Sequence, residues 1–161
     1  MTGDGAVSRS GLHPVLLFAL TATIMIVLAV ISDSAPPWPP WWSRGPGLGL
    51  MLLGTIWNLI QARTFRRAKT TLRPGQAPSQ LVTTGAYAVS RNPMYLGQLV
   101  ILIGLAGLLH AWATWPLPLL AALAFDRLVI PAEESRIATA LPGPWADYQQ
   151  RVRRWLGACK E

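Results

Sequence analysis

The feature that most constrains this chain is a series of long stretches without charge. Residues 12–32 contain no charged side chain, and a helix needs about 20 mostly apolar residues to cross the hydrocarbon core of a bilayer. Three later stretches have the same character: 45–62, 93–111 and 112–131. Asp126 and Arg127 alone interrupt them. We therefore expect an all-α integral membrane protein with four transmembrane helices, forming a single domain over residues 1–161.

The first stretch could also be a cleaved signal peptide. Arg9 precedes it, and Ser32, Asp33 and Ser34 form a weak cleavage pattern. However, the apolar core of a signal peptide is usually about 7–15 residues long, and this stretch is longer. We therefore expect a first span that is retained.

The composition excludes several other classes of protein. Hydrophobic residues make up 52% of the chain and charged residues 13%, whereas a soluble domain carries about 25% charged residues. The single cysteine, Cys159, excludes a disulfide scaffold. The two histidines, His13 and His110, have no neighbours at metal-ligand spacing, so we expect no metal site.

The net charge of +7 indicates contact with anionic membrane lipid. No basic stripe alternates with exposed aromatic residues, so we expect no nucleic-acid partner, and no obligate protein partner is evident. Most arginines and lysines lie in residues 63–92, after residue 135, or at Arg9. The segments 33–44 and 111–118 are instead rich in tryptophan and proline, which suit the opposite headgroup layer. The positive-inside rule thus predicts an inner-membrane protein with both termini in the cytoplasm.

The end of the chain predicts an amphipathic helix over residues 144–156. Gly143 and Pro144 suit a helix start. Helical spacing puts five apolar residues on one face: Trp145, Tyr148, Val152, Trp155 and Leu156. Such a helix either lies on the cytoplasmic leaflet or caps a site from that side.

One polar motif precedes the third apolar stretch. Asn92 and Pro93 form a helix start, in which Asn92 caps free N–H groups and Pro93 takes the first helical position. A helix N-terminus attracts anions, and Arg91 stands beside it. In the first turn, Tyr95 follows, and Gly97 allows a flat group to approach the backbone. The alternative is structural, with Arg91 as a membrane anchor and Tyr95 as an interfacial aromatic residue.

A second polar signal is the pair Glu133 and Glu134 after the fourth stretch. Carboxylates beside a bilayer are candidates for function because burying them is costly. The alternative is that both lie in water and pair with Arg127 or Arg136. The glycines at 45–49, with Gly104 and Gly107, favour close helix packing over nucleotide binding.

Together these signals resemble the isoprenylcysteine carboxyl methyltransferase and phospholipid methyltransferase superfamily. The lead-in is residues 81–87, the core motif is 91–97, and Glu133 and Glu134 follow in order, with a tail at 143–152. Two positions depart from the pattern. Asn92 replaces a histidine, and residues 141–144 replace a Phe-Gly pair.

The resemblance implies an S-adenosylmethionine-dependent membrane methyltransferase. The implied cofactor-binding residues are Ser79, Gln80, Leu81, Val82, Tyr87, Arg91, Asn92, Pro93, Met94, Tyr95, Gly97 and Glu133. The implied catalytic residues are Glu133, Glu134 and Arg127, with Arg127 meeting the substrate. Arg91 suits the cofactor's carboxylate, and the glutamates suit its amino group or ribose.

The resemblance further implies a lipophilic substrate that arrives from the bilayer, foremost an isoprenylcysteine-like carboxylate. A phospholipid amine or a small lipophilic thiol or acid are alternatives. One alternative from another class is a small four-span transporter, which would need a carboxylate inside a span, and Asp126 alone could serve. A second is a non-catalytic membrane scaffold that keeps the family fold.

Overall fold

The computed structural model describes residues 13–67 and 81–157, and within them every regular element is helical. The elements in chain order are α1 (Pro14–Ile31), α2 (Trp41–Arg67), η1 (Gly85–Ala88), α3 (Pro93–Leu109), η2 (Trp112–Thr114), α4 (Pro116–Ala124), η3 (Phe125–Val129), α5 (Ile130–Ala140) and α6 (Pro142–Arg151). The all-α expectation is confirmed.

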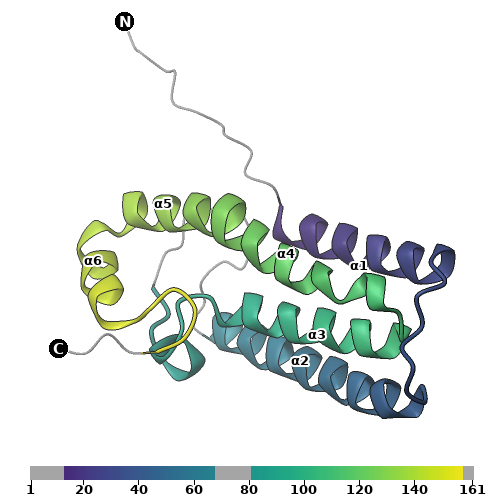
Figure 1. Cartoon of the computed structure of the whole chain (residues 1–161). Helices are drawn as coiled ribbons and strands as arrows, with labels where there is room; N and C mark the ends of the chain where they lie inside the picture. Colours follow the sequence, from purple (N-terminus) through teal and green to yellow (C-terminus); the bar gives the residue numbers. More distant parts are fainter. Residues whose placement is uncertain (1–12, 68–80, 158–161) are drawn as a thin grey trace, which may run out of the picture.

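Helix α3 lies at the centre of the arrangement and contacts α1, α2 and α4, and its contact with α2 runs along much of both helices (Figure 1). Helices α4 and α5, joined by η3, continue as one long rod past the end of α3. At that end lie η1, α6 and residues 152–157, here called the C-terminal tail, far from the loop that joins α1 to α2. The two ends of the bundle are therefore formed by different segments of the chain.

Two helical stretches are long and apolar enough to cross a membrane, namely Pro14–Ile31 and the continuous stretch Trp112–Ala140. Helix α3 is apolar but has 17 residues, and α2 has 27 residues but no sufficiently apolar window. Glycines and polar residues such as Asn58 and Gln61 lower the hydropathy of α2. Of the four expected spans, two thus meet the criterion by length and composition.

Glycines let α2 and α3 approach backbone to backbone. A Cβ added to Gly47 would lie 2.6 Å from the carbonyl oxygen of Gly104, and one added to Gly54 would lie 2.7 Å from that of Gly97. The expected small-residue packing is confirmed for Gly47, Gly104 and Gly107.

The buried core lies between α1, α3 and the long rod. Met25, Leu102, Phe125 and Ile130 are fully buried there. The outer faces of α1 and α2 expose many large apolar side chains, which is the pattern of a surface covered by lipid rather than by water.

The segments between α1 and α2 and between α3 and α4 meet at one end of the bundle. The Trp112 N–H donates to the Ser34 carbonyl at 2.8 Å, and the rings of Trp38 and Trp112 pack edge to face with centroids 4.9 Å apart. Ser43 Oγ lies 2.8 Å from His110 Nδ1. The expectation that both tryptophan-rich turns lie on the same side is confirmed.

The C-terminal helix is shorter than expected. Helix α6 ends at Arg151, and Val152 is already extended, with φ −128° and ψ 131°. The chain then pairs with the segment before α3, where the Gly157 N–H donates to the Val89 carbonyl at 2.9 Å. These backbone bonds replace the helical ones, so the expected helix over residues 152–156 is wrong. Trp145, Tyr148 and Val152 do form a buried cluster, whereas Leu156 is exposed.

Candidate functional site

The first turn of α3 meets the start of α5 through a tyrosine–carboxylate pair. Tyr95 Oη donates to Glu133 Oε2 at 2.8 Å. The Tyr95 ring is buried and packs against Phe125 with centroids 4.8 Å apart. Among the described residues, this hydroxyl is the hydrogen-bond partner of Glu133, and no cation lies within ion-pair distance of it.

The helix that carries Glu133 is widened just before it. Residues Phe125–Val129 form a π-helical turn, in which the Ile130 N–H donates to the Phe125 carbonyl. Pro131 explains the widening, because its ring has no N–H and would clash with the carbonyl of Arg127 in a regular α-helix. Such π-turns often occur at functional sites.

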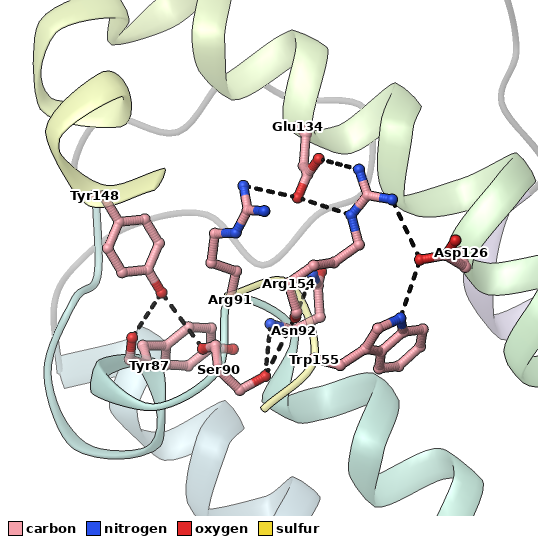
Figure 2. A network of polar contacts seen from close by, with 9 residues as sticks. All are labelled: Tyr87, Ser90, Arg91, Asn92, Asp126, Glu134, Tyr148, Arg154 and Trp155. Atoms are coloured by element: carbon pink, nitrogen blue, oxygen red, sulfur yellow. Dashed lines mark hydrogen bonds and ion pairs between the residues drawn. The ribbon is translucent and has the colours of Figure 1, made fainter. Parts of the chain in front are cut away.

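Glu134 is engaged differently from its neighbour. Its Oε1 lies 3.1 Å from Arg91 Nη1, and its Oε2 accepts a hydrogen bond from Arg154 Nη2 at 2.7 Å (Figure 2). Only 9% of Glu134 is exposed. The alternative that the glutamates pair with Arg127 or Arg136 is therefore wrong for Glu134, since its partners are two other arginines.

Arg154 extends this network to Asp126. Its Nη1 donates to Asp126 Oδ1 at 3.2 Å, and Trp155 Nε1 donates to the same oxygen at 3.0 Å. Hydrogen bonds to Glu134 and then to Asp126 raise the pKa of Arg154, although partial burial opposes them. Sequence reasoning missed Arg154 and Trp155, because their partners lie 20 and 29 residues away in the chain.

Asn92 takes a different role from the expected one. It occupies the N-cap position of α3, yet its side chain makes no capping hydrogen bond. Instead Nδ2 donates to the Arg154 carbonyl at 3.1 Å, and the Asn92 N–H donates to Ser90 Oγ at 3.1 Å. The side-chain cap is therefore wrong, because the amide is used to hold the tail. Pro93 does take the first helical position.

Two tyrosines close the same end of the bundle. The Tyr148 hydroxyl donates to the Tyr87 carbonyl at 2.7 Å, and the Tyr87 ring packs edge to face on Phe65 with centroids 5.2 Å apart. Burial raises the pKa of Tyr148 to about 12, against a smaller effect of Arg91. Burial also raises the pKa of Tyr87, and Tyr148 and Glu133 raise it further. Both phenols are therefore neutral hydrogen-bonding groups at physiological pH.

Arg91 has unused hydrogen-bonding capacity. Its side chain is 13% exposed, and its guanidinium carbon lies 5.5 Å from the centroid of the Trp145 ring. Nη1 is close to Glu134 but out of hydrogen-bond alignment, and the buried Nε has no partner among the described residues. Since buried donors are normally satisfied, Arg91 is suited to hold an anionic group.

The structure thus brings most of the expected site residues to one end of the bundle. The exceptions are Gly97, which faces α2, the exposed Arg127, and two residues that the structure does not describe. Gly97 faces α2, where an added Cβ would lie 2.8 Å from Asn58 Cγ, so it serves helix packing there. Arg127 has a side chain that is 76% exposed and pairs with Asp126 at 3.3 Å. Ser79 and Gln80 lie outside the described residues.

The remaining expected contact residues lie at the start of α3 and in the segment before η1. Pro93 is buried and Met94 half-buried at its start. Leu81 packs on the cluster around Trp145, and Val82 is half-buried beside it. At the opposite end of the bundle, an apolar groove of about 400 Å³ is lined chiefly by residues of α2 and α3 and by tryptophans. That groove is far from Glu134, Arg91 and Arg154.

The fold and the site define a helical membrane protein with tyrosines, carboxylates and arginines gathered at one end of its bundle. The family model of phospholipid methyltransferases matches residues 42–140, which is more than half of the chain. The chain belongs to the phospholipid methyltransferase family, as its motifs indicated, and this family makes it a membrane methyltransferase. Comparisons with curated proteins and with solved structures gave no match.

Proposed function

We propose that this protein transfers a methyl group from S-adenosylmethionine to a lipophilic acceptor at the membrane. The observation that carries the proposal is the unequal use of the two glutamates. Glu134 is neutralised by Arg91 and Arg154, whereas Glu133 contacts a tyrosine hydroxyl and has no cationic partner among the described residues. A carboxylate without a cationic partner and an arginine with spare donors, at the same end of the bundle, suit a ligand that carries both an amino group and a carboxylate.

In this proposal the residues around α3 share the binding of the cofactor, which supplies the methyl group when bound. Arg91 holds the carboxylate, Glu133 the amino group or ribose, and Tyr87 and Tyr95 pack on the adenine or face the sulfonium. The contacts from the lead-in and the first turn of α3 are Ser79, Gln80, Leu81, Val82, Asn92, Pro93 and Met94. Arg127, exposed beside Asp126, meets the substrate from the lipid side.

The acceptor proposed first is an isoprenylcysteine-like carboxylate. A carboxylate is already a nucleophile, so alignment and exclusion of water are the main requirements. The second candidate is a phospholipid amine, and in that case Glu133 acts as its proton acceptor instead of holding the cofactor's amino group. An amine arrives as an ammonium and needs a proton acceptor, and Glu133 has no paired cation among the described residues.

We further propose that all four helical stretches cross the inner membrane, with both termini in the cytoplasm and α6 on the cytoplasmic leaflet. The basic end of α2, with Arg66 and Arg67 in its last turn, then lies beside the site, and the tryptophan-rich turns lie on the other side. The cofactor would reach the site from the cytosol. A transporter receives less support, because Asp126 is held by Arg154 and Trp155.

The proposal is tested by calorimetric titration of S-adenosylmethionine into the purified protein in detergent. Saturable binding is expected, and its absence would refute the proposal. A second assay in nanodiscs follows transfer of a labelled methyl group to a prenylated cysteine, phosphatidylethanolamine and a lipophilic thiol, offered separately. Labelling of the prenylated cysteine supports the first acceptor, and labelling of phosphatidylethanolamine supports the second.

A further inference from the structure

The C-terminal tail lies beyond the matched residues 42–140, yet it contacts the centre of the candidate site. The Arg91 N–H donates to the Arg153 carbonyl at 3.0 Å. The Asn92 side chain donates to the Arg154 carbonyl at 3.1 Å. The tail backbone is therefore attached to the two residues that immediately precede α3.

The side chain of Arg154 joins two carboxylates of the long helix. It contacts both oxygens of Glu134, through Nε at 3.3 Å and Nη2 at 2.7 Å. Its third nitrogen, Nη1, reaches Asp126 at 3.2 Å, and Trp155 donates to the same carboxylate (Figure 2). All three nitrogens of one guanidinium are thus used.

The π-turn makes this bridge possible. In an unbroken α-helix, residues eight positions apart differ by about 80° around the axis, because each residue advances about 100°. A π-turn takes up one extra residue, which reduces the difference to about 20°. The widening over Phe125–Val129 therefore turns Asp126 toward the face that carries Glu134, where Arg154 can reach both.

The contacts of Arg154 with Glu134 also determine how many hydrogen-bond donors of Arg91 remain unpaired. Without Arg154, the carboxylate of Glu134 would have Arg91 as its single cationic partner and would draw it into a two-bond contact. With Arg154 on both oxygens, Arg91 keeps one ion-pair contact and its buried Nε keeps no partner among the described residues. The spare donors of Arg91 thus depend on Arg154.

We propose that Arg154, anchored by Asp126, is a positioning residue that keeps Arg91 free to bind the carboxylate of the cofactor. This inference rests on the proposed methyltransferase function. Arg154 acts through Glu134 and Arg91 and does not itself contact the ligand. Its loss should therefore weaken only ligands that carry a carboxylate.

The test compares two ligands on the full-length protein in detergent. S-adenosylhomocysteine carries the amino-acid group, whereas 5′-methylthioadenosine has the same nucleoside without it. For Arg154→Gln, the affinity for S-adenosylhomocysteine should fall about tenfold, as for the loss of one charge-assisted hydrogen bond. The affinity for 5′-methylthioadenosine and the kcat at saturating cofactor should stay unchanged.

Substitutions of Asp126 and of Arg153 should differ in their effect on this affinity. Asp126→Asn leaves Glu134 and its arginines in place and should weaken S-adenosylhomocysteine about threefold, since it removes one partly exposed ion pair. Arg153→Gln changes the exposed neighbour of Arg154 and should alter the affinity less than about twofold.

The outcomes separate this inference from the proposed function. A selective loss for S-adenosylhomocysteine in either bridge variant supports the positioning role. Equal losses for the two ligands, or no loss in Asp126→Asn and Arg154→Gln, would overturn it while the proposed function stands. If the unmodified protein binds neither S-adenosylmethionine nor S-adenosylhomocysteine, the proposed function fails and this inference fails with it.

Discussion

Glu133 and Glu134 are neighbours in sequence with different environments. Glu133 accepts one hydrogen bond from Tyr95, and Glu134 is buried between two arginines. A carboxylate with little structural engagement can be neutralised at small cost to folding, whereas removal of one charge from a buried ion pair leaves its partners uncompensated. The same substitution should therefore weaken cofactor binding at Glu133 and lower the stability of the fold at Glu134.

Glu133→Gln should weaken S-adenosylmethionine binding by about 1.5–3 kcal/mol, the range for a hydrogen bond to a charged group. It should leave thermal stability unchanged, because glutamine still accepts a bond from Tyr95. Glu134→Gln should lower the free energy of unfolding by about 2 kcal/mol, since Arg154 is partly exposed and the buried-pair figure must be reduced. Calorimetric titration and thermal unfolding of both variants measure the contrast, and equal effects of both variants on both quantities would contradict it.

Asn92 holds the C-terminal tail through its side-chain amide. Asn92→Asp cannot donate to the Arg154 carbonyl and places a negative charge against it, so it should destabilise the protein by about 1–3 kcal/mol. If Asn92 were a cap instead, aspartate would serve equally well. Thermal unfolding of this variant beside Asn92→His, which retains a ring N–H donor, distinguishes the two roles. An aspartate variant as stable as the unmodified protein would restore the capping interpretation.

At the scale of elements, the close contact between α2 and α3 determines where the site-bearing start of α3 lies. Trp57 Nε1 of α2 donates to the Pro93 carbonyl at 2.8 Å, so the first turn of α3 is held directly by α2. Gly47 and Gly49 are separated by one residue in sequence and differ in what surrounds them. Gly47 faces the α3 backbone, and nothing lies within 4 Å of a Cβ on Gly49.

Gly47→Ala should destabilise the bundle by about 1–3 kcal/mol, because the α3 backbone would have to move to accept the methyl group. Gly49→Ala is the matched control and should be neutral or stabilising by up to about 1 kcal/mol through helix propensity. Thermal unfolding in one detergent measures both variants. A Gly47 variant that unfolds at the same temperature as the control would mean that the two helices are not in backbone contact.

At the scale of the whole molecule, the two ends of the bundle differ in chemistry. Trp38, Trp112, Ser43 and His110 meet at one end, and Arg91, Arg154 and Glu134 meet at the other, where Figure 1 shows α6. This division predicts which end faces the cytosol.

Single cysteines in a Cys159→Ser background should report the orientation. Pro37→Cys, in the exposed turn between α1 and α2, should react with an impermeant maleimide in intact cells. Arg67→Cys, at the exposed end of α2, should react only after the membrane is opened. The reverse pattern would place the site outside the cytosol and remove the proposed access of the cofactor.

The local features of this chain could be predicted from its sequence, because they depend on neighbouring residues. Uninterrupted apolar stretches predicted the helices, Pro93 marked the start of α3, and Gly47, Gly104 and Gly107 indicated close packing. The ordered motifs from Leu81 to Glu134 also indicated the family that residues 42–140 confirm.

The tertiary structure alone determined which partner each polar side chain contacts. The sequence places Glu133 beside Glu134 and suggests no difference, but the α-helical rotation of about 100° between them sends one to Tyr95 and the other to two arginines. The sequence predicts that the side chain of Asn92 caps α3, but in the fold this side chain donates to the Arg154 carbonyl of the tail instead. The helix expected through residue 156 ends at Arg151, because the following backbone groups find partners near Val89. Each of these outcomes depends on groups tens of residues apart in the chain, and only the folded arrangement brings them within bonding distance.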